Sequence, residues 1–389
     1  MTAPIARLFD ITRLINRAGM HPTGVDRVEV AYLRALIAHP VPFFAVARTA
    51  LGYVLIDRNG ASATLAALDA NIWGKPDLIS RLNPRLSGSR RLGQSFLRKH
   101  AVARCARYRL ARMLAAHLPA EFTYLNVGHS NLNTRMFRGV GAARKVVLIH
   151  DTIPLDHPDT QASGAADAFA TKLFLVSTHA DLVICTSTQC TADVTRYLGQ
   201  LGRIPDIVTA HLGVEVPTPD PAMQCPDMPY FVTVGTIEPR KNHVMLLDIW
   251  ANWPDAPLLV ICGKRGWNNR DVFARLDSHP AQVIEHNKLS DGQIAALVKG
   301  AAGMLFPSNA EGFGLPPAEA LALGTRVVCA SLPVYGEILG DSAVYVAAND
   351  SYLWEKAIKK LAASDWPDKT PQYVPPTWDA HFKTVLSKV

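Results

Sequence analysis

MLFPSNAEGFGLPPAEALAL, at residues 304–323, contains an apolar run, a glycine loop and a helical pattern in direct succession. The apolar run Met304–Phe306 predicts a buried strand, and Pro316-Pro317 predict the first turn of a helix, where the missing N–H costs nothing. Glycines 312 and 314 leave no side chain between the backbone amides and a ligand. The free N–H groups and the positive end of the helix dipole therefore predict a seat for a phosphate or a sugar oxygen.

Two carboxylates flank this loop. Glu311 precedes the turn, and Glu319 lies about one turn into the helix. Both are placed to accept hydrogen bonds from hydroxyl groups at opposite ends of one ligand. The alternative is that Glu319 only complements the helix dipole and that Glu311 is a solvated loop residue.

The same succession of strand and helix recurs along the whole chain. Apolar runs on successive residues indicate strands that are covered on both faces, and their alternation with helical patterns predicts βαβ units. Asn59-Gly60 reads as a turn after one of these strands. We therefore expect an α/β fold with two doubly wound, Rossmann-like domains. The strand-like runs lie at 6–11, 41–46, 53–56, 122–126, 145–149, 181–185, 230–234, 258–262, 283–285, 304–306 and 326–329.

A proline-rich segment, 217–229, separates the two halves. Five prolines in thirteen residues cannot sustain a helix or a central strand, so this segment is predicted to be the interdomain linker. We expect a first domain at 1–216, a second domain at 230–370, and a C-terminal helix within 371–389 that packs back on the first domain. In such open sheets, ligands bind beyond the carboxyl ends of the strands, which here predicts a cleft between the domains.

The composition excludes several classes of protein. The chain has 389 residues, of which 49% are hydrophobic and 19% charged, and no apolar run approaches the ~18–20 residues that span a bilayer. The N-terminal residues lack the apolar core of a secretory signal. Six scattered cysteines form no C-x-x-C pair, which predicts buried reduced thiols rather than disulfides or a zinc site. These features predict a cytoplasmic protein.

The net charge of +7 is concentrated in one stretch. Ten basic residues and no acidic residue lie between Arg81 and Arg112, interleaved with apolar side chains up to Leu114. A basic helix with an apolar face can lie on an anionic membrane, which would place the protein on the inner face of the cytoplasmic membrane. An ordinary solvated helix face is the second interpretation. A nucleic-acid patch is the last, because no nucleic-acid motif is present.

A second dense segment, VGTIEPRKNH at residues 234–243, follows the first strand of the second half. Arg240 and Lys241 stand side by side at the start of a predicted helix. Cations there oppose the helix dipole unless an anion is bound, and the planar fork of Arg with the point charge of Lys suits a diphosphate. The alternative is a pair of surface charges.

Three segments in this order carry a family resemblance: GTIEPRKNH (235–243), LVICGKRGW (259–267) and LFPSNAEGFGLPPAEALALGTRVV (305–328). They resemble the donor domain of retaining GT-B glycosyltransferases of family 4, a group that includes bacterial polysaccharide mannosyl- and rhamnosyltransferases. The first half resembles the acceptor domain of that family more loosely. The segments of that half are FDITRL, PTGVDRVEVAYL, VVLIHDTIPLDHP, ADLVICTST and HLGVEVP.

The resemblance implies roles for the glycine loop. It assigns Glu311 to hydroxyls of the donor sugar, Glu319 to the ribose of the nucleotide, and the backbone amides of the loop to sugar and phosphate oxygens. The loop residues concerned are Gly312, Phe313, Gly314 and Leu315.

The resemblance also assigns Arg240 and Lys241 to the diphosphate. Many members of the family carry an Arg directly after the glycine of the first strand in this domain, where this chain has Thr236. That difference leaves open which cation meets which phosphate.

Three further residues are implied to line the cleft. His150, at the end of the VVLIH strand, matches a histidine of the reaction centre, and Gly24 matches a glycine loop that faces the donor phosphates. Lys264 matches a position near the base or the diphosphate. The alternative for His150 is a purely structural histidine, and His129 also follows a strand.

The implied function is transfer of a sugar, with a leaning towards mannose from GDP-mannose, to a hydroxyl of a lipid-linked saccharide in surface polysaccharide or lipopolysaccharide synthesis. The family retains anomeric configuration, and same-face attack is expected because no nucleophilic carboxylate is evident on the acceptor side. No D-x-D motif follows a strand, so we expect neither a metal nor another cofactor. The alternatives are a different GT-B enzyme, such as a sugar-nucleotide epimerase, and a non-catalytic nucleotide- or glycan-binding subunit.

Overall fold

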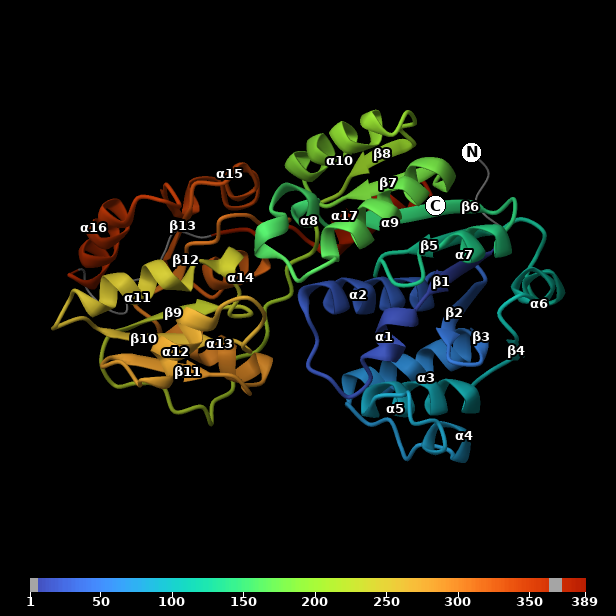
Figure 1. Ribbon diagram of the computed structural model, residues 1–389, viewed down its shortest axis with the longest axis horizontal. Helices are drawn as coiled ribbons and strands as arrows, with labels where there is room; N and C mark the ends of the chain where they lie inside the picture. The colour runs from blue at the N-terminus through green and yellow to red at the C-terminus, as the bar shows by residue number, and fades with distance from the viewer. Residues whose placement is uncertain (1–5, 364–372) are drawn as a thin grey trace.

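The computed structural model describes residues 6–363 and 373–389, and it contains two α/β units joined by two crossings of the chain (Figure 1). Residues 1–5 of the expected first domain and the expected boundary at 370/371 lie outside the described residues. The first unit is built on one eight-stranded sheet and the second on one six-stranded sheet.

The first sheet has the strand order β4-β3-β2-β1-β5-β6-β7-β8. The pairs from β2 through β1 to β8 are parallel, and β3 and β4 add an antiparallel edge. The order reverses between β1 and β5, so the loops after these two strands open a crevice at the carboxyl edge. The strands are β1 (Arg7–Asp10), β2 (Phe43–Thr49), β3 (Gly52–Asp57), β4 (Ala103–Cys105), β5 (Thr123–Asn126), β6 (Arg144–Ile149), β7 (Leu182–Cys185) and β8 (Asp206–Thr209).

Ten α-helices and a short 3-10 helix of the described residues connect and cover these strands. They are α1 (Thr12–Asn16), α2 (Gly24–Ala38), α3 (Arg58–Asp69), α4 (Leu78–Arg81), α5 (Gly88–Lys99), α6 (Leu110–His117), α7 (Thr134–Gly139), α8 (Ile153–Asp156), η1 (Pro158–Thr160), α9 (Ala165–His179) and α10 (Thr188–Gln200).

The second sheet is parallel throughout, with the strand order β11-β10-β9-β12-β13-β14. Numbered within this unit the order is 3-2-1-4-5-6, the doubly wound arrangement of nucleotide-binding domains, and it reverses between β9 and β12. The loops after β9 and β12 therefore stand side by side at the carboxyl edge. The strands are β9 (Tyr230–Val234), β10 (Leu258–Cys262), β11 (Val283–His286), β12 (Gly303–Phe306), β13 (Val327–Ala330) and β14 (Val344–Val346).

The helices of the second unit follow its strands in alternation. They are η2 (Pro239–Lys241), α11 (His243–Ala251), α12 (Arg270–Asp277), α13 (Asp291–Gly300), α14 (Leu315–Ala322), α15 (Pro333–Leu339), η3 (Gly340–Ser342) and α16 (Ser351–Ala362).

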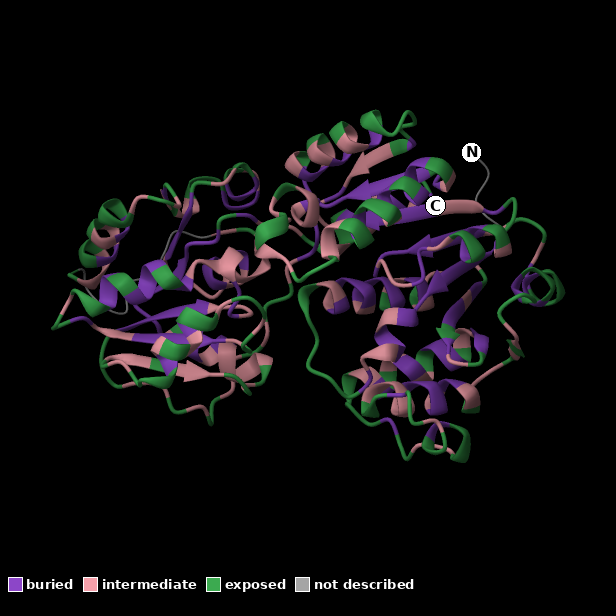
Figure 2. Ribbon diagram, viewed as in Figure 1, coloured by how far each residue is buried: buried purple, intermediate pink, exposed green. Residues whose placement is uncertain are grey.

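Buried residues run along the strands of both sheets, and exposed residues gather on the outer faces of the helices (Figure 2). Strand β12 is buried at every position, as is β13. Strands covered on both faces need continuous apolar runs, which is why LLVIC and VVLI lack the alternation of a half-exposed strand. The expected doubly wound α/β fold is confirmed for both units.

The chain crosses between the units twice. Residues 210–229 hold no helix or strand and lead from β8 to β9. After the second unit, α17 (Trp378–Leu386) lies against α2 of the first unit, where Tyr32 Oη and His381 Nε2 are 2.7 Å apart. Burial lowers the pKa of His381 to about 4, so its ring is neutral at pH 7.

The basic stretch 81–112 is not one helix. It runs from the end of α4 through α5 and β4 into α6. Arg98 is turned inward, with a side chain only 7% exposed, and binds Asp77 through two nitrogens at 2.6 and 2.7 Å. The basic residues are therefore divided among several short elements, with β4 at the edge of the sheet between α5 and α6. No helix among residues 6–363 and 373–389 is long and apolar enough to cross a bilayer.

Candidate active site

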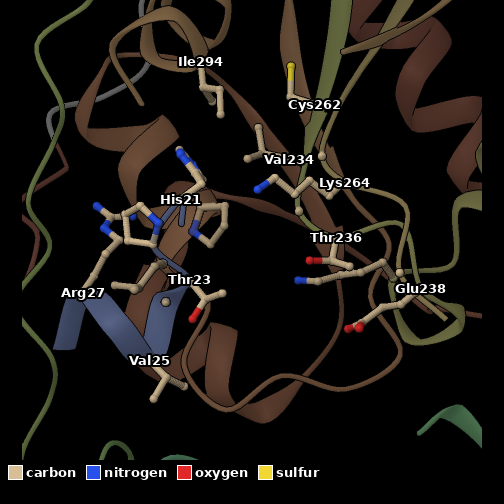
Figure 3. Close-up of a pocket in the computed structure, with 18 of the residues that line it drawn as sticks. His21, Thr23, Val25, Arg27, Val234, Thr236, Glu238, Cys262, Lys264 and Ile294 are labelled. Atoms are coloured by element: carbon tan, nitrogen blue, oxygen red, sulfur yellow. The ribbon is translucent and has the colours of Figure 1, made fainter. Parts of the chain in front are cut away.

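A cavity of about 940 Å³ lies between the two units, at the carboxyl ends of β9 and β12. Figure 3 shows His21, Thr23 and Arg27 of the first unit on one side, and Thr236, Glu238 and Lys264 of the second unit on the other. Segments that follow β1 and β6 of the first sheet and β9 and β12 of the second sheet line this space, and open α/β sheets bind ligands beyond the carboxyl ends of their strands.

The glycine loop forms one wall, and its geometry explains its residues. Gly314 has a φ of 92° immediately before α14, and a Cβ there would lie 2.5 Å from the ring of Tyr335. A Cβ on Gly312 would lie 2.6 Å from the backbone oxygen of His150. The loop therefore passes between a buried tyrosine and the end of β6, and only glycine fits at these two points.

Helix α2 begins directly opposite α14. The nearest atom to a Cβ built on Gly24 is Cδ1 of Leu315, at 3.9 Å. Arg13 and Arg17 hold the start of α2 in place, since each donates through Nε to Asp26 at 2.7 Å. Two helix N-termini thus face the cavity from opposite domains, and both favour an anion between them.

The cations after β9 and the carboxylate after β12 form a single buried group. Glu311 Oε1 lies 2.6 Å from both Arg240 Nη1 and Lys241 Nζ. Arg240 also binds Glu238 at 2.6 Å, and Lys241 Nζ lies 4.3 Å from the centre of the Phe306 ring. Two carboxylates therefore neutralise the two cations.

Burial and mutual attraction compete in this group. Burial raises the pKa of Glu311, but Arg240 and Lys241 together lower it below its ordinary value. Burial lowers the pKa of Lys241, and Glu311 offsets that effect only in part. Buried charged groups with shifted pKa values of this kind are typical of functional sites.

His150 lines the cavity at the end of β6. Its Nε2 lies 2.7 Å from the oxygen of Val127, so Nε2 carries the proton and donates while Nδ1 remains an acceptor. Burial lowers its pKa to about 4. His129 lies beside it, with ring centroids 5.2 Å apart and ring planes tilted by 58°, and burial lowers its pKa to about 3. The pair is neutral at pH 7 and supplies hydrogen bonds rather than charge.

Asp151 was missed by the sequence reasoning. It lies in the cavity beside His150, and its Oδ1 accepts from the backbone N–H of Ile153 at 3.1 Å. Burial raises the pKa of this carboxyl, while Arg240 pulls it downward. The signal was present in the sequence, because a charged residue directly after a buried strand is a site candidate. Asp151 thus places a carboxylate on the wall that the first unit contributes, where none was expected from the sequence.

Glu319 is turned towards the first unit, where its Oε1 lies 2.7 Å from Nη1 of Arg27 on α2. Arg27 lines the cavity, whereas Glu319 stands behind its wall. Nothing in the sequence singles out Arg27, because it is one of several charged residues on an amphipathic helix.

The far end of the cavity is less polar. Val234, Cys262, Leu289 and Ile294 line it, and Lys264 reaches over it from the loop after β10. A flat aromatic base suits an apolar slot with a few polar groups at its rim. Thr236 also lines the cavity, two residues beyond β9.

The structure thus brings nearly all the predicted residues to one cavity. They are Gly24, His150, Thr236, Arg240, Lys241, Lys264, Glu311, Gly312, Phe313, Gly314 and Leu315, with Glu319 just outside the lining. Among residues 6–363 and 373–389, no three His, Cys, Asp or Glu side chains are grouped to hold a metal ion.

Known proteins resemble the chain in sequence and in fold. Residues 225–373 match the family described as Glycosyl transferases group 1. The chain is similar to the serotype-specific mannosyltransferase WbdA of Escherichia coli, with 28% identity over 240 residues, covering 56% of this chain and 29% of WbdA. It is also similar to the O-antigen chain mannosyltransferase RfbU of Salmonella typhimurium, with 31% identity over 135 residues, covering 34% of this chain and 38% of RfbU. The chain therefore spans only about a third of the length of these relatives.

Solved structures share the whole fold. Sucrose-phosphate synthase from Thermosynechococcus elongatus aligns with a TM-score of 0.61 at 15% identity, over 92% of this chain and 90% of that one. HepE from Anabaena, in complex with UDP-glucose, aligns with a TM-score of 0.60 at 14% identity, over 98% and 94% of the two chains. The fold is the GT-B fold, and the part of the chain that matches the glycosyl transferases group 1 family lies in the second unit.

Proposed function

We propose that this protein is a retaining glycosyltransferase that moves a sugar, mannose in our preferred version, from a nucleotide diphosphate sugar to a hydroxyl of a saccharide. The observation that carries the proposal is the set of Arg240, Lys241 and Glu311, placed between two opposed helix N-termini. Such a set offers donors for a diphosphate and an acceptor for sugar hydroxyls within one cavity.

The charges explain how the leaving group would be stabilised. In a transfer with an oxocarbenium-like transition state, negative charge grows on the departing phosphate. Arg240, Lys241 and the first turn of α14 would meet that charge at fixed positions, without reorganising water. Glu311 would then release the cations and accept from hydroxyls of the donor sugar.

The end of β6 would face the anomeric centre. His150 is neutral, so it would bind a sugar hydroxyl and not supply charge. We favour attack of the acceptor hydroxyl on the same face as the departing phosphate, which takes its proton. Asp151 offers the rival route, in which its carboxylate forms a covalent glycosyl intermediate. Mass spectrometry of the enzyme mixed with donor alone tests this rival, because a stable adduct on Asp151 would contradict same-face attack.

The preference for mannose rests on the relatives. WbdA and RfbU are both named mannosyltransferases, and RfbU acts on the O-antigen chain. We therefore propose GDP-mannose as donor and a lipid-linked saccharide of surface polysaccharide or lipopolysaccharide synthesis as acceptor. No metal or other cofactor enters this proposal.

The most direct test is calorimetric titration with GDP, UDP, ADP and dTDP, followed by the matching sugar nucleotides. Tight binding of GDP and turnover of GDP-mannose are expected, and the anomeric configuration of the product is read by NMR. Inversion would refute the retaining mechanism. Binding without turnover on any acceptor would favour the non-catalytic subunit.

A membrane-facing surface is part of the proposal. Leu78 is the first residue of α4 and is 71% exposed, and Leu82, the C-cap residue of that helix, is 81% exposed. Arg81 and Arg85 lie close to them in the sequence. Exposed apolar residues beside basic ones suit an anionic bilayer at the cytoplasmic face.

The test for this surface is flotation with vesicles that contain anionic lipid. Replacing Leu78 and Leu82 by Ser, with Arg81 and Arg85 replaced by Glu, should abolish flotation. The charge reversal of Lys359 and Lys360, which lie on the second unit, is the matched control. Flotation that survives the first change would remove the membrane from the proposal.

A further inference from the structure

Two hydroxyl groups are buried near Glu311 without a hydrogen-bond partner. They belong to Ser308, which follows β12, and to Tyr335 on α15, and both residues are completely buried. Among the residues that the structure describes, neither Oγ of Ser308 nor Oη of Tyr335 has a partner in hydrogen-bonding geometry. A donor that is taken out of water costs free energy unless the protein pairs it, so buried hydroxyls are nearly always paired. Two exceptions in one place therefore require an explanation.

The ring of Tyr335 has a packing role that its oxygen does not share. A Cβ on Gly314 would lie 2.5 Å from Cε1 of this ring, and the ring of Phe306 meets it edge-on, with centroids 6.1 Å apart. A phenylalanine would fill the same space beneath the glycine loop. Since the oxygen of Tyr335 contributes nothing to this packing, its presence in the core points to a polar role.

Glu311 is the charged group to which both hydroxyls relate. Burial raises the pKa of Tyr335, and the charge of Glu311 raises it further, so the phenol keeps its proton and remains a donor. Ser308 lowers the pKa of Glu311 and also that of Tyr335, as expected of a hydroxyl that lies close to both. Tyr335, Ser308 and Glu311 therefore form a short series of polar groups that ends at the carboxylate.

The charge of Glu311 is directed to the two cations in this structure. Arg240 Nη1 and Lys241 Nζ both lie 2.6 Å from its Oε1. The backbone N–H of Asn309, next to Ser308, donates to the oxygen of Arg240 at 2.8 Å, so the two loops are fixed to each other. A buried carboxylate that separates from its cations is left without the partners that offset its burial. Hydroxyl donors close to it would replace them, because hydrogen bonds to a charged oxygen are strong.

We propose that the hydroxyls of Ser308 and Tyr335 are positioning groups for Glu311. They hold its carboxylate when the diphosphate of a nucleotide takes over the two cations. Tyr335 then donates to Ser308, and Ser308 donates to Glu311, which keeps its charge and faces the hydroxyls of the donor sugar. This inference rests on the proposed function, because it requires a diphosphate on the cations. It gives a role in binding to two residues that do not themselves line the cavity.

Tyr335→Phe is the main test, because stability and nucleotide affinity should change in opposite directions. Without nucleotide, removal of an unpartnered hydroxyl should leave the melting temperature unchanged or raise it by roughly 2–4 °C. In calorimetric titration, GDP should bind about tenfold more weakly, since a hydrogen bond to a charged group is lost from the bound state. Ser308→Ala should weaken GDP in the same way. The double variant should lose no more than either single variant, because the two hydroxyls act in series.

The Glu311→Gln variant separates an effect through the carboxylate from an effect of packing. In that protein, Tyr335→Phe should change the affinity for GDP by less than about twofold, because the charge that the hydroxyls hold is absent. Tyr345→Phe is the matched control in the same unit, since Tyr345 Oη donates to the backbone oxygen of Tyr335 at 3.1 Å. Loss of this partnered hydroxyl should lower the melting temperature by roughly 2–4 °C and leave the affinity for GDP unchanged.

Three results would overturn the inference. Tyr335→Phe would bind GDP with the unaltered affinity, would melt at a clearly lower temperature, or would weaken GDP equally in the Glu311→Gln protein. If the unaltered protein binds neither GDP nor UDP, the proposed function fails with it. If the unaltered protein binds GDP and Tyr335→Phe binds it equally well, only this inference is refuted.

Discussion

Replacing Glu311 by Gln should move stability and nucleotide affinity in opposite directions. The substitution keeps the shape of the side chain but removes the charge that lies 2.6 Å from both Arg240 and Lys241. Glu311 and Lys241 are each only 10% exposed, so little water is available to replace the lost partner. Among the residues that the structure describes, Lys241 is left without another ion pair, because Glu238 binds Arg240.

The magnitude follows from the burial of the group. Two unit charges about 4 Å apart attract by ~4 kcal/mol in an effective dielectric of ~20, and removing one member of a buried pair costs ~3–5 kcal/mol. For a domain of this size, a loss of ~3 kcal/mol lowers the melting temperature by roughly 6–12 °C. GDP should bind about tenfold more tightly, because its diphosphate no longer competes with a carboxylate for the two cations.

The assay combines thermal unfolding without ligand, calorimetric titration of GDP, and turnover of the sugar nucleotide. Turnover should fall about a hundredfold, since Glu311 also holds the donor sugar in the proposed mechanism. Asp248→Asn is the control in the same domain, because Asp248 pairs with Arg275 on the surface and its loss should cost at most ~1 kcal/mol. A variant that loses stability yet binds GDP more weakly would refute the competition between Glu311 and the diphosphate.

Three further predictions follow from the packing of the two domains. His150 is neutral in the folded protein, where its pKa is lowered from 6.5 to about 4, so the unfolded chain binds a proton at a higher pH than the folded one. The free energy of unfolding should therefore fall by roughly 3 kcal/mol between pH 6.5 and pH 4. His150→Gln should reduce that loss, as measured by urea titrations at the two pH values. Gly314→Ala should cost roughly 2–4 kcal/mol, because it adds a methyl group 2.5 Å from Tyr335 at a φ of 92°, and unchanged thermal unfolding would contradict this. Trp354→Ala should cost ~3–5 kcal/mol because the side chain is fully buried, and calorimetric unfolding that moves by less than 1 kcal/mol would show that α16 does not belong to the core.

Much of the fold could be predicted from the sequence because the strands are covered on both faces. Continuous apolar runs such as LLVIC stand out from the amphipathic helices between them, so the alternation could be followed along most of the chain. The prediction of local structure was wrong where a contact from a neighbouring residue outweighed the preference of a short motif. Asn59-Gly60 indicated a turn, but Asp57 accepts from the N–H of Gly60 and caps α3, so both residues lie in its first turn.

The residues of the candidate site could be predicted for a different reason. Residues after β9 and β12 are far apart in the sequence, yet the strand order places both loops at one edge of the sheet. A dense motif at each strand end was therefore enough to predict that Arg240, Lys241 and Glu311 meet. Arg27 lay beyond such reasoning, because its partner is on the other domain and its contact depends on how the two domains face each other.

The path of the chain has a consequence for the order of assembly during synthesis. Helix α17 belongs to the first domain by its contacts, since His381 binds Tyr32 and the ring of Trp378 occupies the space beside Gly213. It is nevertheless translated after the whole second domain. The ribosome therefore delivers the complete second unit while one face of α2 is still uncovered. Helix α17 begins 340 positions after the end of α2 (378 − 38), so a translating chain completes the second unit before the first.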